Sequence, residues 1–364
     1  MAKSLRARIR DGDFIICAEG YLFEFERRGY LQAGPFVPEV ALDHPHLLTV
    51  MYEEFVHAGS DIVQAFTYYA HRSKLQRICR EHELEALNRN ALQRARAVAD
   101  HTGTLMAGNI SNTNEYVPDR PDTHNLIREM YKESVNWAVQ EGADLIIAET
   151  LGEFHEARIA LEIMKQYAPS LGYVVNFSQH QIEALTTNDG VAFVDAFNQL
   201  RGMGADIVGL NCSTGPKTMT PMIQRIRDSY KGPMAAVPVP YRTTPEMPQM
   251  QQMTVKETGK RAYPYNQDMF LCAVEDVVEF ANTCKEHEVK FVGLCCGNSA
   301  RYTRVLAETL GRTPGASRYR PDFRKHHLFG DDPTLNKFYT TDIRSKLEAQ
   351  GAGIKAVDQH NLGN

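Results

Sequence analysis

The fold is decided by Gln140-Glu141-Gly142-Ala143-Asp144-Leu145-Ile146, a phrase whose pattern recurs twice more in the chain. Residues 57–63 and 202–208 repeat it: a helix-like segment reaches a glycine, a short turn follows, and an aspartate precedes leucine or β-branched residues. A glycine just past a helix adopts the left-handed conformation that ends the helix. The phrase therefore predicts the same helix-to-strand junction at three places.

Around these junctions, short apolar runs alternate with longer amphipathic segments. Eight runs have the length and composition of buried strands: 14–18, 61–66, 105–109, 144–149, 173–177, 206–211, 234–239 and 290–295. Helical periodicity lies at 43–58, 81–101, 121–141, 153–167, 189–203, 217–230, 268–288 and 299–310. Strict alternation requires a parallel sheet, and eight units of roughly 35–40 residues fit a closed barrel better than an open sheet. We predict an α/β protein with a (β/α)8 TIM barrel.

The end of the chain differs from the eight repeats. Basic residues and prolines gather between 312 and 327, and a helix is predicted over 341–350. We expect residues 1–311 to form the barrel and residues 312–364 to form a C-terminal arm outside it. Such an arm would pack on the barrel or on a second subunit and serve oligomerisation.

Composition excludes several classes of function. Of the 364 residues 43% are hydrophobic and 23% charged, which is typical of a globular protein with a sizeable core. The net charge of −5 gives no reason to expect nucleic acid or an anionic membrane as partner. No apolar run reaches the length of a membrane span, and no apolar signal core follows the basic N-terminus. Seven cysteines are too few for a disulfide scaffold, so we expect a reducing cytoplasm.

Three cysteines stand where predicted strands end. Cys212 closes the run 208–212, and Cys295 and Cys296 close the run 291–296. Barrel enzymes carry their catalytic residues at the carboxyl ends of strands. Adjacent strand residues point to opposite faces, so the cysteine pair must lie where the strand breaks, and Gly297 supplies that break. Three thiolates with one open position suit catalytic Zn²⁺, and a thiol substrate would fill the gap.

The alternative use of the pair is a vicinal disulfide or redox switch. The other four cysteines are expected to be small buried apolar residues; they are Cys17, Cys79, Cys272 and Cys284. Glu149 also ends a predicted strand. A buried carboxylate is costly without a partner, so a cationic group is expected near it. Asn211, beside Cys212, is expected to orient a ligand.

The cysteine motifs resemble the zinc signature of the homocysteine S-methyltransferase family, and its betaine-dependent members in particular. The likeness covers about residues 12–310 and is pronounced at 27–35, 53–60 and 64–70. It implies a (β/α)8 barrel in which Cys212, Cys295 and Cys296 hold Zn²⁺ and homocysteine binds as a thiolate. A small onium donor, glycine betaine foremost, would supply the methyl group that yields methionine. The donor could instead be a sulfonium compound (S-methylmethionine or dimethylsulfoniopropionate), and another thiol could replace homocysteine.

The resemblance also implies roles for other residues and a dimeric or tetrameric assembly. Tyr69 matches a tyrosine near the metal, and Glu149 matches a glutamate that binds the ammonium group of the amino acid. Aromatic faces for an onium group would come from Tyr68 and Phe36. Gln64 and Ala65 fall where the family contacts substrate. A barrel that binds metal or senses redox state without methyl transfer is the alternative of a different class.

Three departures from the family pattern surround the substrates. Ala18-Glu19-Gly20 stands where the family has Asp-Gly-Gly, so Glu19 and Gly20 are predicted substrate contacts with an altered charge pattern. Thr150 replaces a tyrosine of the betaine enzymes, and Phe36 replaces a tryptophan. These three departures lie near the expected binding sites of the donor and of the amino-acid head group, while the metal site keeps the family pattern. The sequence therefore predicts the metal and the activated thiol but does not identify the methyl donor.

Overall fold

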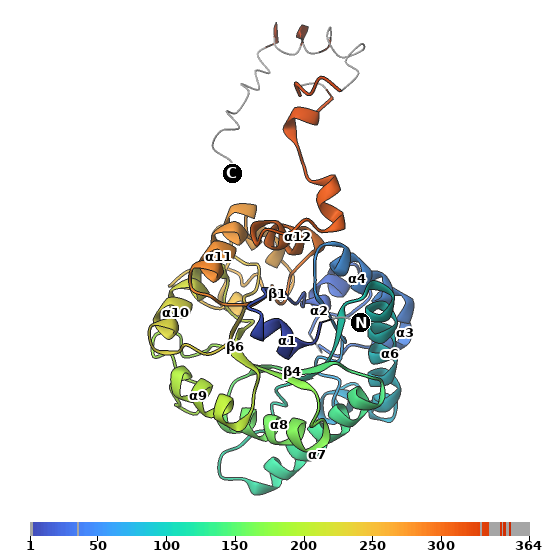
Figure 1. The fold of residues 1–364 in the computed structure, drawn as a ribbon, viewed down its shortest axis with the longest axis vertical. Coiled ribbons are helices and arrows are strands. Elements are labelled where there is room, and N and C mark those ends of the chain that lie inside the picture. The colour runs from blue at the N-terminus through green and yellow to red at the C-terminus, as the bar shows by residue number, and fades with distance from the viewer. Residues whose placement is uncertain are drawn as a thin grey trace. The chain divides into compact units, whose positions relative to one another are not determined.

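Eight parallel strands form one sheet that curls into a barrel inside a ring of helices (Figure 1). The strands are β1 (Ile15–Ile16), β2 (Ile62–Gln64), β3 (Leu105–Ser111), β4 (Leu145–Leu151), β5 (Gly172–Phe177), β6 (Ile207–Asn211), β7 (Met234–Val237) and β8 (Phe291–Val292). Their order is β1-β8-β7-β6-β5-β4-β3-β2. In the computed structural model each predicted strand overlaps an observed one, and the predicted (β/α)8 barrel is confirmed.

The aspartate of the repeated phrase has one structural task in all three copies. The carboxylates of Asp61, Asp144 and Asp206 each accept the backbone N–H of a residue in the preceding strand, at 2.7, 2.8 and 2.9 Å. At the seam between β1 and β2 the described residues form one β-bridge, from Cys17 to Ile62, and the Asp61 N–H donates to the Ile16 carbonyl at 2.7 Å. Asp61 therefore contributes much of the closure of the barrel there.

Helices follow the strands as predicted, with additions in the loops. The α-helices of the described residues are α1 (Leu5–Arg10), α2 (Tyr21–Arg27), α3 (Val40–Asp43), α4 (Pro45–His57), α5 (Arg72–Gln76), α6 (Leu84–Thr102), α7 (Pro121–Gln140), α8 (Phe154–Tyr167), α9 (Phe193–Met203), α10 (Pro216–Ser229), α11 (Val274–Glu286) and α12 (Ala300–Thr309). Short 3-10 turns occur at Glu81–Glu83, Met250–Gln252, Gln267–Phe270, Gly315–Tyr319 and Phe323–Lys325. The prediction of a helix from 268 was wrong at its start, because a 3-10 turn and a β-bridge between Tyr241 and Leu271 precede α11.

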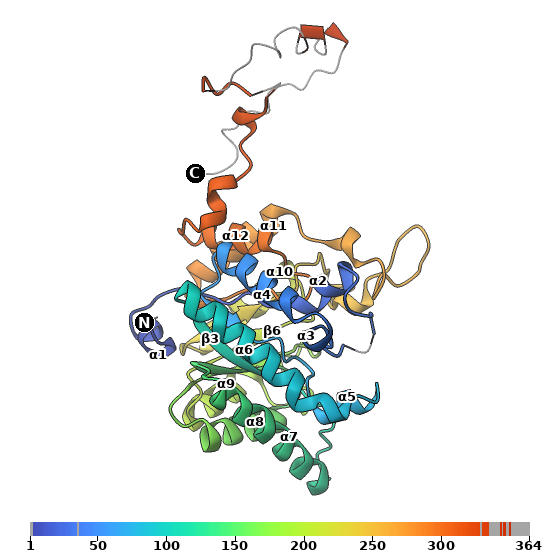
Figure 2. The ribbon, with the colours of Figure 1, turned by 90° about the vertical axis from the view of Figure 1, so that its right-hand side faces the viewer.

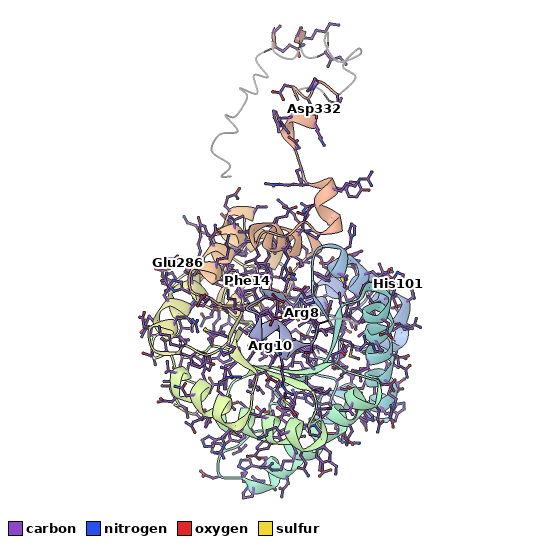
Figure 3. The ribbon with its side chains drawn as sticks, in the orientation of Figure 1. Arg8, Arg10, Phe14, His101, Glu286 and Asp332 are labelled. Atoms are coloured by element: carbon purple, nitrogen blue, oxygen red, sulfur yellow. The ribbon has the colours of Figure 1, made fainter. Side chains whose placement is uncertain are left out.

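Helix α1 covers the amino-terminal end of the barrel. Leu5 is buried, and Arg6 and Arg8 form ion pairs with Asp206 and Asp61 at 2.9 and 3.0 Å. Figure 3 shows Arg8 and Arg10 in front of the middle of the ring, and Figure 2 shows α1 on the side opposite to α2, α3 and α5. The strands point away from α1, so their carboxyl ends face the loops that build the site.

The structure describes residues 3–34, 36–327, 330–334, 343, 345, 346, 349 and 350. The chain divides into two compact units, one ending at Ser317 and the other beginning at Arg318. Half of the predicted helix over 341–350 lies outside the described residues, so the arm stays a prediction. Within the described part of the chain, no helix is long and apolar enough to cross a membrane. Cys79 is exposed, and the expectation that it is buried was wrong, because it lies in a turn with φ +57°.

Candidate functional site

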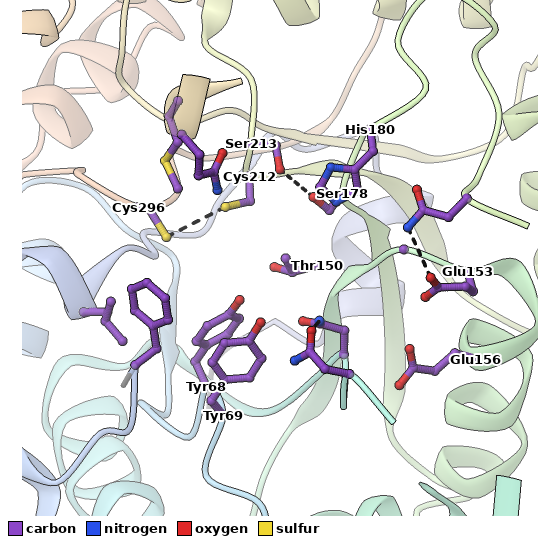
Figure 4. A pocket seen from close by; sticks show the side chains of 18 of the residues that line it. Tyr68, Tyr69, Thr150, Glu153, Glu156, Ser178, His180, Cys212, Ser213 and Cys296 are labelled. Carbon is purple, nitrogen blue, oxygen red and sulfur yellow. Dashed lines mark hydrogen bonds between the residues drawn. The ribbon is translucent and has the colours of Figure 1, made fainter. Parts of the chain in front are cut away.

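A cavity of about 420 Å³ opens at the carboxyl ends of the strands (Figure 4). It is lined by Leu22, Phe23, Phe36, Tyr68, Tyr69, Asn112, Asn114, Tyr116, Thr150, Gly152, Glu153, Glu156, Ser178, His180, Asn188, Cys212, Ser213, Met250, Gln251, Tyr263 and Cys296. Nine described residues other than glycine have a positive φ, and six of them line this cavity: Phe36, Tyr69, Asn114, Thr150, Cys212 and Ser213. Backbone strain of this kind gathers at functional sites because the surrounding structure must hold it in place. The cavity is therefore the candidate site.

Three thiols cluster beside this cavity, and two of them, Cys212 and Cys296, line it. The Sγ atoms of Cys212 and Cys296 lie 3.8 Å apart, those of Cys295 and Cys296 lie 3.9 Å apart, and all three fall within 4.8 Å of one another. Tetrahedral Zn²⁺ with Zn–S bonds of about 2.3 Å requires sulfurs about 3.8 Å apart. The spacing fits a metal held by three thiolates. The two flanking thiols hold the pKa of Cys212 well below its usual range, because they hydrogen-bond its sulfur.

Local backbone geometry creates this cluster. Cys212 follows β6 directly and, like Ser213, has a positive φ, which turns the chain out of the strand. Cys295 and Cys296 follow the short strand β8 and precede Gly297, whose φ of +93° makes the predicted break. Both cysteines of the pair can then face one point, which a regular strand forbids.

A second, deeper cavity of about 30 Å³ lies beside the thiols. It is lined by Glu19, Gly20, Tyr21, Leu22, Gln64, Ala65, Phe66, Tyr68, Glu149, Cys295 and Cys296. The Glu149 carboxylate accepts amide N–H groups from Gln64 (2.8 Å), Asn109 (2.5 Å) and Asn211 (3.0 Å). Burial nevertheless raises the pKa of Glu149 to about 7. The Glu19 carboxylate accepts no hydrogen bond from the described residues. Its burial, and to a lesser extent the charge of Glu149, raises the pKa of Glu19 well above the usual range.

Aromatic rings form one wall of the large cavity. The ring of Phe36 lies 6.2–6.5 Å from the rings of Phe23, Tyr69 and Tyr263, measured between centroids. The rings of Tyr68 and Tyr69 pack in a tilted arrangement with centroids 4.2 Å apart, and both reach into the cavity in Figure 4. The Lys74 ammonium lies 3.8 Å from the Tyr69 centroid, so a cation already covers one face of that ring. A second cation would have to use the remaining faces.

The predicted site residues come together around these two cavities. The predicted residues that line the large cavity are Phe36, Tyr68, Tyr69, Thr150, Cys212 and Cys296. Those that line the deep cavity are Glu19, Gly20, Gln64, Ala65, Tyr68, Glu149, Cys295 and Cys296. Asn211 lines neither and instead links Glu149 to Thr150, accepting the Thr150 N–H at 2.8 Å. Their roles toward substrate stay predictions.

Sequence reasoning missed several residues of the site, among them Asn109 and Tyr263. Asn109 on β3 donates to Glu149, and its signal was a polar side chain at the carboxyl end of an otherwise apolar predicted strand. Tyr263 belongs to the aromatic wall but comes from the long loop after β7, where no periodic pattern marks it. Tyr21, which lines the deep cavity, donates to the Ala18 carbonyl at 3.1 Å and packs in the core with Tyr52 and Phe66.

The fold and the site define a (β/α)8-barrel enzyme with a three-thiol centre fit for a metal beside an aromatic-walled cavity. The chain belongs to the homocysteine S-methyltransferase family, whose model matches residues 20–310. The protein is accordingly an S-methyltransferase, and the resemblance inferred from the cysteine motifs is confirmed.

Individual relatives of the chain are also named as homocysteine S-methyltransferases. The chain is 25% identical over 338 residues to betaine–homocysteine S-methyltransferase 1 of Xenopus tropicalis, covering 90% of this chain and 80% of that protein. It is 26% identical over 332 residues to S-methylmethionine–homocysteine S-methyltransferase of Rattus norvegicus, covering 90% and 86%. The metallated form of the homocysteine methyltransferase MmuM from Escherichia coli has a TM-score of 0.64 and 18% identity, covering 83% and 98%, and supports the fold.

Proposed function

We propose that this protein transfers a methyl group from a small onium compound, glycine betaine foremost, to the sulfur of homocysteine and so forms methionine. The observation that carries the proposal is the thiol cluster: three sulfurs spaced as Zn²⁺ requires, beside a cavity with an aromatic wall. Family membership supports the acceptor, since the family is that of homocysteine S-methyltransferases.

Cys212, Cys295 and Cys296 would hold the Zn²⁺. The ion would supply thiol activation, because a ligated thiol loses its proton and the thiolate is the nucleophile. Cys212 and Cys295 are 5% and 3% exposed, so little water would compete at that end of the cavity. Asn211 supports the same arrangement, since it stands next to Cys212 and donates to Glu149.

The acceptor would lie between the thiols and Glu149. The three amides around Glu149 leave its carboxylate anchored and oriented, ready to accept from the ammonium group of homocysteine. Gln64 and Ala65 line the same deep cavity and would flank the acceptor's carbon chain.

The donor would use the aromatic wall. Rings hold quaternary ammonium and sulfonium groups by cation–π attraction, and Phe36, Tyr69 and Tyr263 surround one volume above Cys296. The sulfur's electron pair forms the new S–CH₃ bond while the donor's C–N bond breaks and its pair stays on nitrogen. The positive charge on the donor nitrogen and the negative charge on the sulfur thereby both disappear, which a water-poor cavity favours. No general acid is needed.

Turnover tests the proposal directly. Purified, zinc-loaded protein is incubated with homocysteine and one donor at a time: glycine betaine, S-methylmethionine and dimethylsulfoniopropionate. The sulfonium donors are included because the Rattus norvegicus relative is named for S-methylmethionine. Methionine is expected with at least one donor, glycine betaine first. No methionine with any of the three would refute the specific reaction.

A metal measurement separates this proposal from a redox-sensing barrel. About one zinc ion per chain is expected in freshly reduced protein. A protein that retained its function without bound metal would favour the redox reading of Cys295 and Cys296. We further propose a dimer or tetramer that works in the cytoplasm. The mass in solution, with and without residues 312–364, tests the role of the arm.

A further inference from the structure

Lys74 is a buried cation that the proposed reaction does not use. It lies on α5 and is 8% exposed, and its ammonium group has neither a hydrogen bond nor an ion pair with the described residues. The ammonium instead lies over the face of the Tyr69 ring, 3.8 Å from its centroid. Burying a charge without an ionic partner is costly, so its retention at this position indicates a role.

The rings of Tyr68 and Tyr69 separate Lys74 from the large cavity. Both tyrosines line that cavity, whereas Lys74 does not. The Tyr68 centroid lies 4.2 Å from that of Tyr69. Two groups so close to one centroid cannot share a face, so Tyr68 and the Lys74 ammonium lie on opposite faces of the Tyr69 ring. A cation held on the cavity side of these rings would then be about 10 Å from Lys74.

The Lys74 charge acts on the cavity from behind its aromatic wall. Burial foremost, and then the charge of Arg77, lowers the pKa of Lys74 to about 8, while Glu115 acts in the opposite sense. The ammonium is therefore mostly charged at neutral pH. The large cavity has no lysine or arginine among its described lining residues. A positive field on its aromatic side therefore comes from Lys74.

Methyl transfer removes the charge that this field acts on. The donor binds with a full positive charge, keeps about half of it in the transition state and leaves without it. A fixed positive charge nearby therefore destabilises the bound donor more than the transition state.

The thiolate loses negative charge in the same step, but it lies farther from Lys74. Tyr69 follows β2 and Cys212 follows β6, and these two strands stand on opposite sides of the barrel. Figure 4 shows Cys212 and Cys296 on one side of the cavity, with Tyr68 and Tyr69 on the other. The effect of Lys74 on the donor therefore exceeds its effect on the sulfur.

We propose that the Lys74 charge weakens the binding of the onium donor and speeds the loss of its methyl group. Lys74 acts through space, since the two tyrosine rings lie between it and the cavity. It thus sets the balance between donor affinity and turnover. This inference rests on the proposed function, because it requires an onium donor beside Tyr68 and Tyr69.

The kinetics of Lys74→Met test the charge, measured with the donor that yields methionine. Two unit charges about 10 Å apart, at an effective dielectric constant of about 20, change an affinity about tenfold. We expect the donor KM to fall about tenfold and kcat to fall about threefold, because half of the charge remains in the transition state, so kcat/KM should rise about threefold. A damaged site would lower kcat/KM. That result, or an unchanged kcat, would overturn the proposal.

Two control variants isolate the charge from the packing. Lys74→Arg keeps the charge, so both constants should stay within about twofold of the wild type; a fall in both like that of Lys74→Met would speak against the charge. Lys290→Met is the matched control, since its ammonium lies 4.3 Å from the centroid of Phe14, which precedes β1 at the amino-terminal end of the barrel. Its donor KM and kcat should equal those of the wild type. The KM for homocysteine should be unchanged in all three variants.

Binding without turnover keeps the inference distinct from the proposed reaction. Titration calorimetry on zinc-loaded full-length protein compares glycine betaine with 3,3-dimethylbutanoate, in which a neutral carbon replaces the nitrogen. Glycine betaine should gain about tenfold in affinity relative to 3,3-dimethylbutanoate when Lys74 becomes methionine. The same affinity ratio in both proteins, or no binding of either compound, would overturn the inference. Failure to form methionine with any donor refutes the proposed reaction, yet the affinity ratio still decides whether Lys74 repels an onium group.

Discussion

Gly20 lies between β1 and α2 and packs against the backbone of Cys295, so adding one methyl group there should damage the thiol cluster. Its φ is +92°, and a Cβ atom would lie 2.3 Å from the carbonyl oxygen of Cys295. An ordinary carbon–oxygen contact is about 3.3 Å, so the Cys295 backbone would have to move by about 1 Å. That carbonyl also accepts the Asn298 N–H at 2.9 Å, a bond that holds the turn after Cys296.

Two costs add up in Gly20→Ala. The left-handed backbone costs an alanine about 1 kcal/mol, and displacement of the cysteine pair should lower zinc affinity about 10- to 100-fold, as loss of supporting groups around metal ligands does. Gly12→Ala is the matched control: its φ is +72°, but nothing lies within 4 Å of the added Cβ atom. It should lose about 1 kcal/mol of unfolding free energy and keep full zinc affinity.

The assay measures zinc affinity by competition with a chelator, and stability by urea unfolding, for both variants and the wild type. If Gly20→Ala bound zinc as tightly as Gly12→Ala, the contact between Gly20 and Cys295 would not control the metal site, and the reasoning would fail.

Three other predictions follow from the same structure. Cys212→Ala should remove one of the three ligands, so zinc content should fall from about one ion per chain to near zero while circular dichroism stays that of the wild type. Tyr263→Leu should raise the KM for the donor about fivefold, the worth of about 1 kcal/mol of cation–π attraction, and leave the KM for homocysteine unchanged; equal shifts of both constants would contradict a donor role. Burial lowers the pKa of His71 to about 3, so the unfolded chain binds one more proton between pH 6.5 and 3 and the free energy of unfolding falls with pH in that window. By pH 5 the wild type should lose about 2 kcal/mol more than His71→Phe does, measured by urea unfolding.

Most of the barrel could be predicted because its elements are local patterns repeated many times. A glycine that ends a helix and an aspartate that starts a strand depend on their immediate neighbours, and the aspartates at 61, 144 and 206 proved to accept a backbone N–H of the preceding strand. Helix α2 was not predicted, because it is only seven residues long and follows a left-handed glycine, so its sequence shows no amphipathic period.

The site could be predicted only in part. Cysteines at the ends of two predicted strands indicated a metal and an activated thiol, because parallel strands of a barrel end on one face. Asn109 and Tyr263 were not predicted, because no pattern along the chain marks them. Their roles follow only from their contacts, that of Asn109 with Glu149 and that of Tyr263 with the Phe36 ring.

The sequence by itself thus determined the parallel barrel, the face on which the site lies, and the residue types that carry its chemistry. Only the tertiary structure decided that three sulfurs lie at the spacing of a tetrahedral metal, and that Glu19 faces Glu149 without a partner. Such distances join residues far apart in the chain. They depend on barrel closure and on the left-handed backbone at Cys212 and Gly20, which no local pattern encodes.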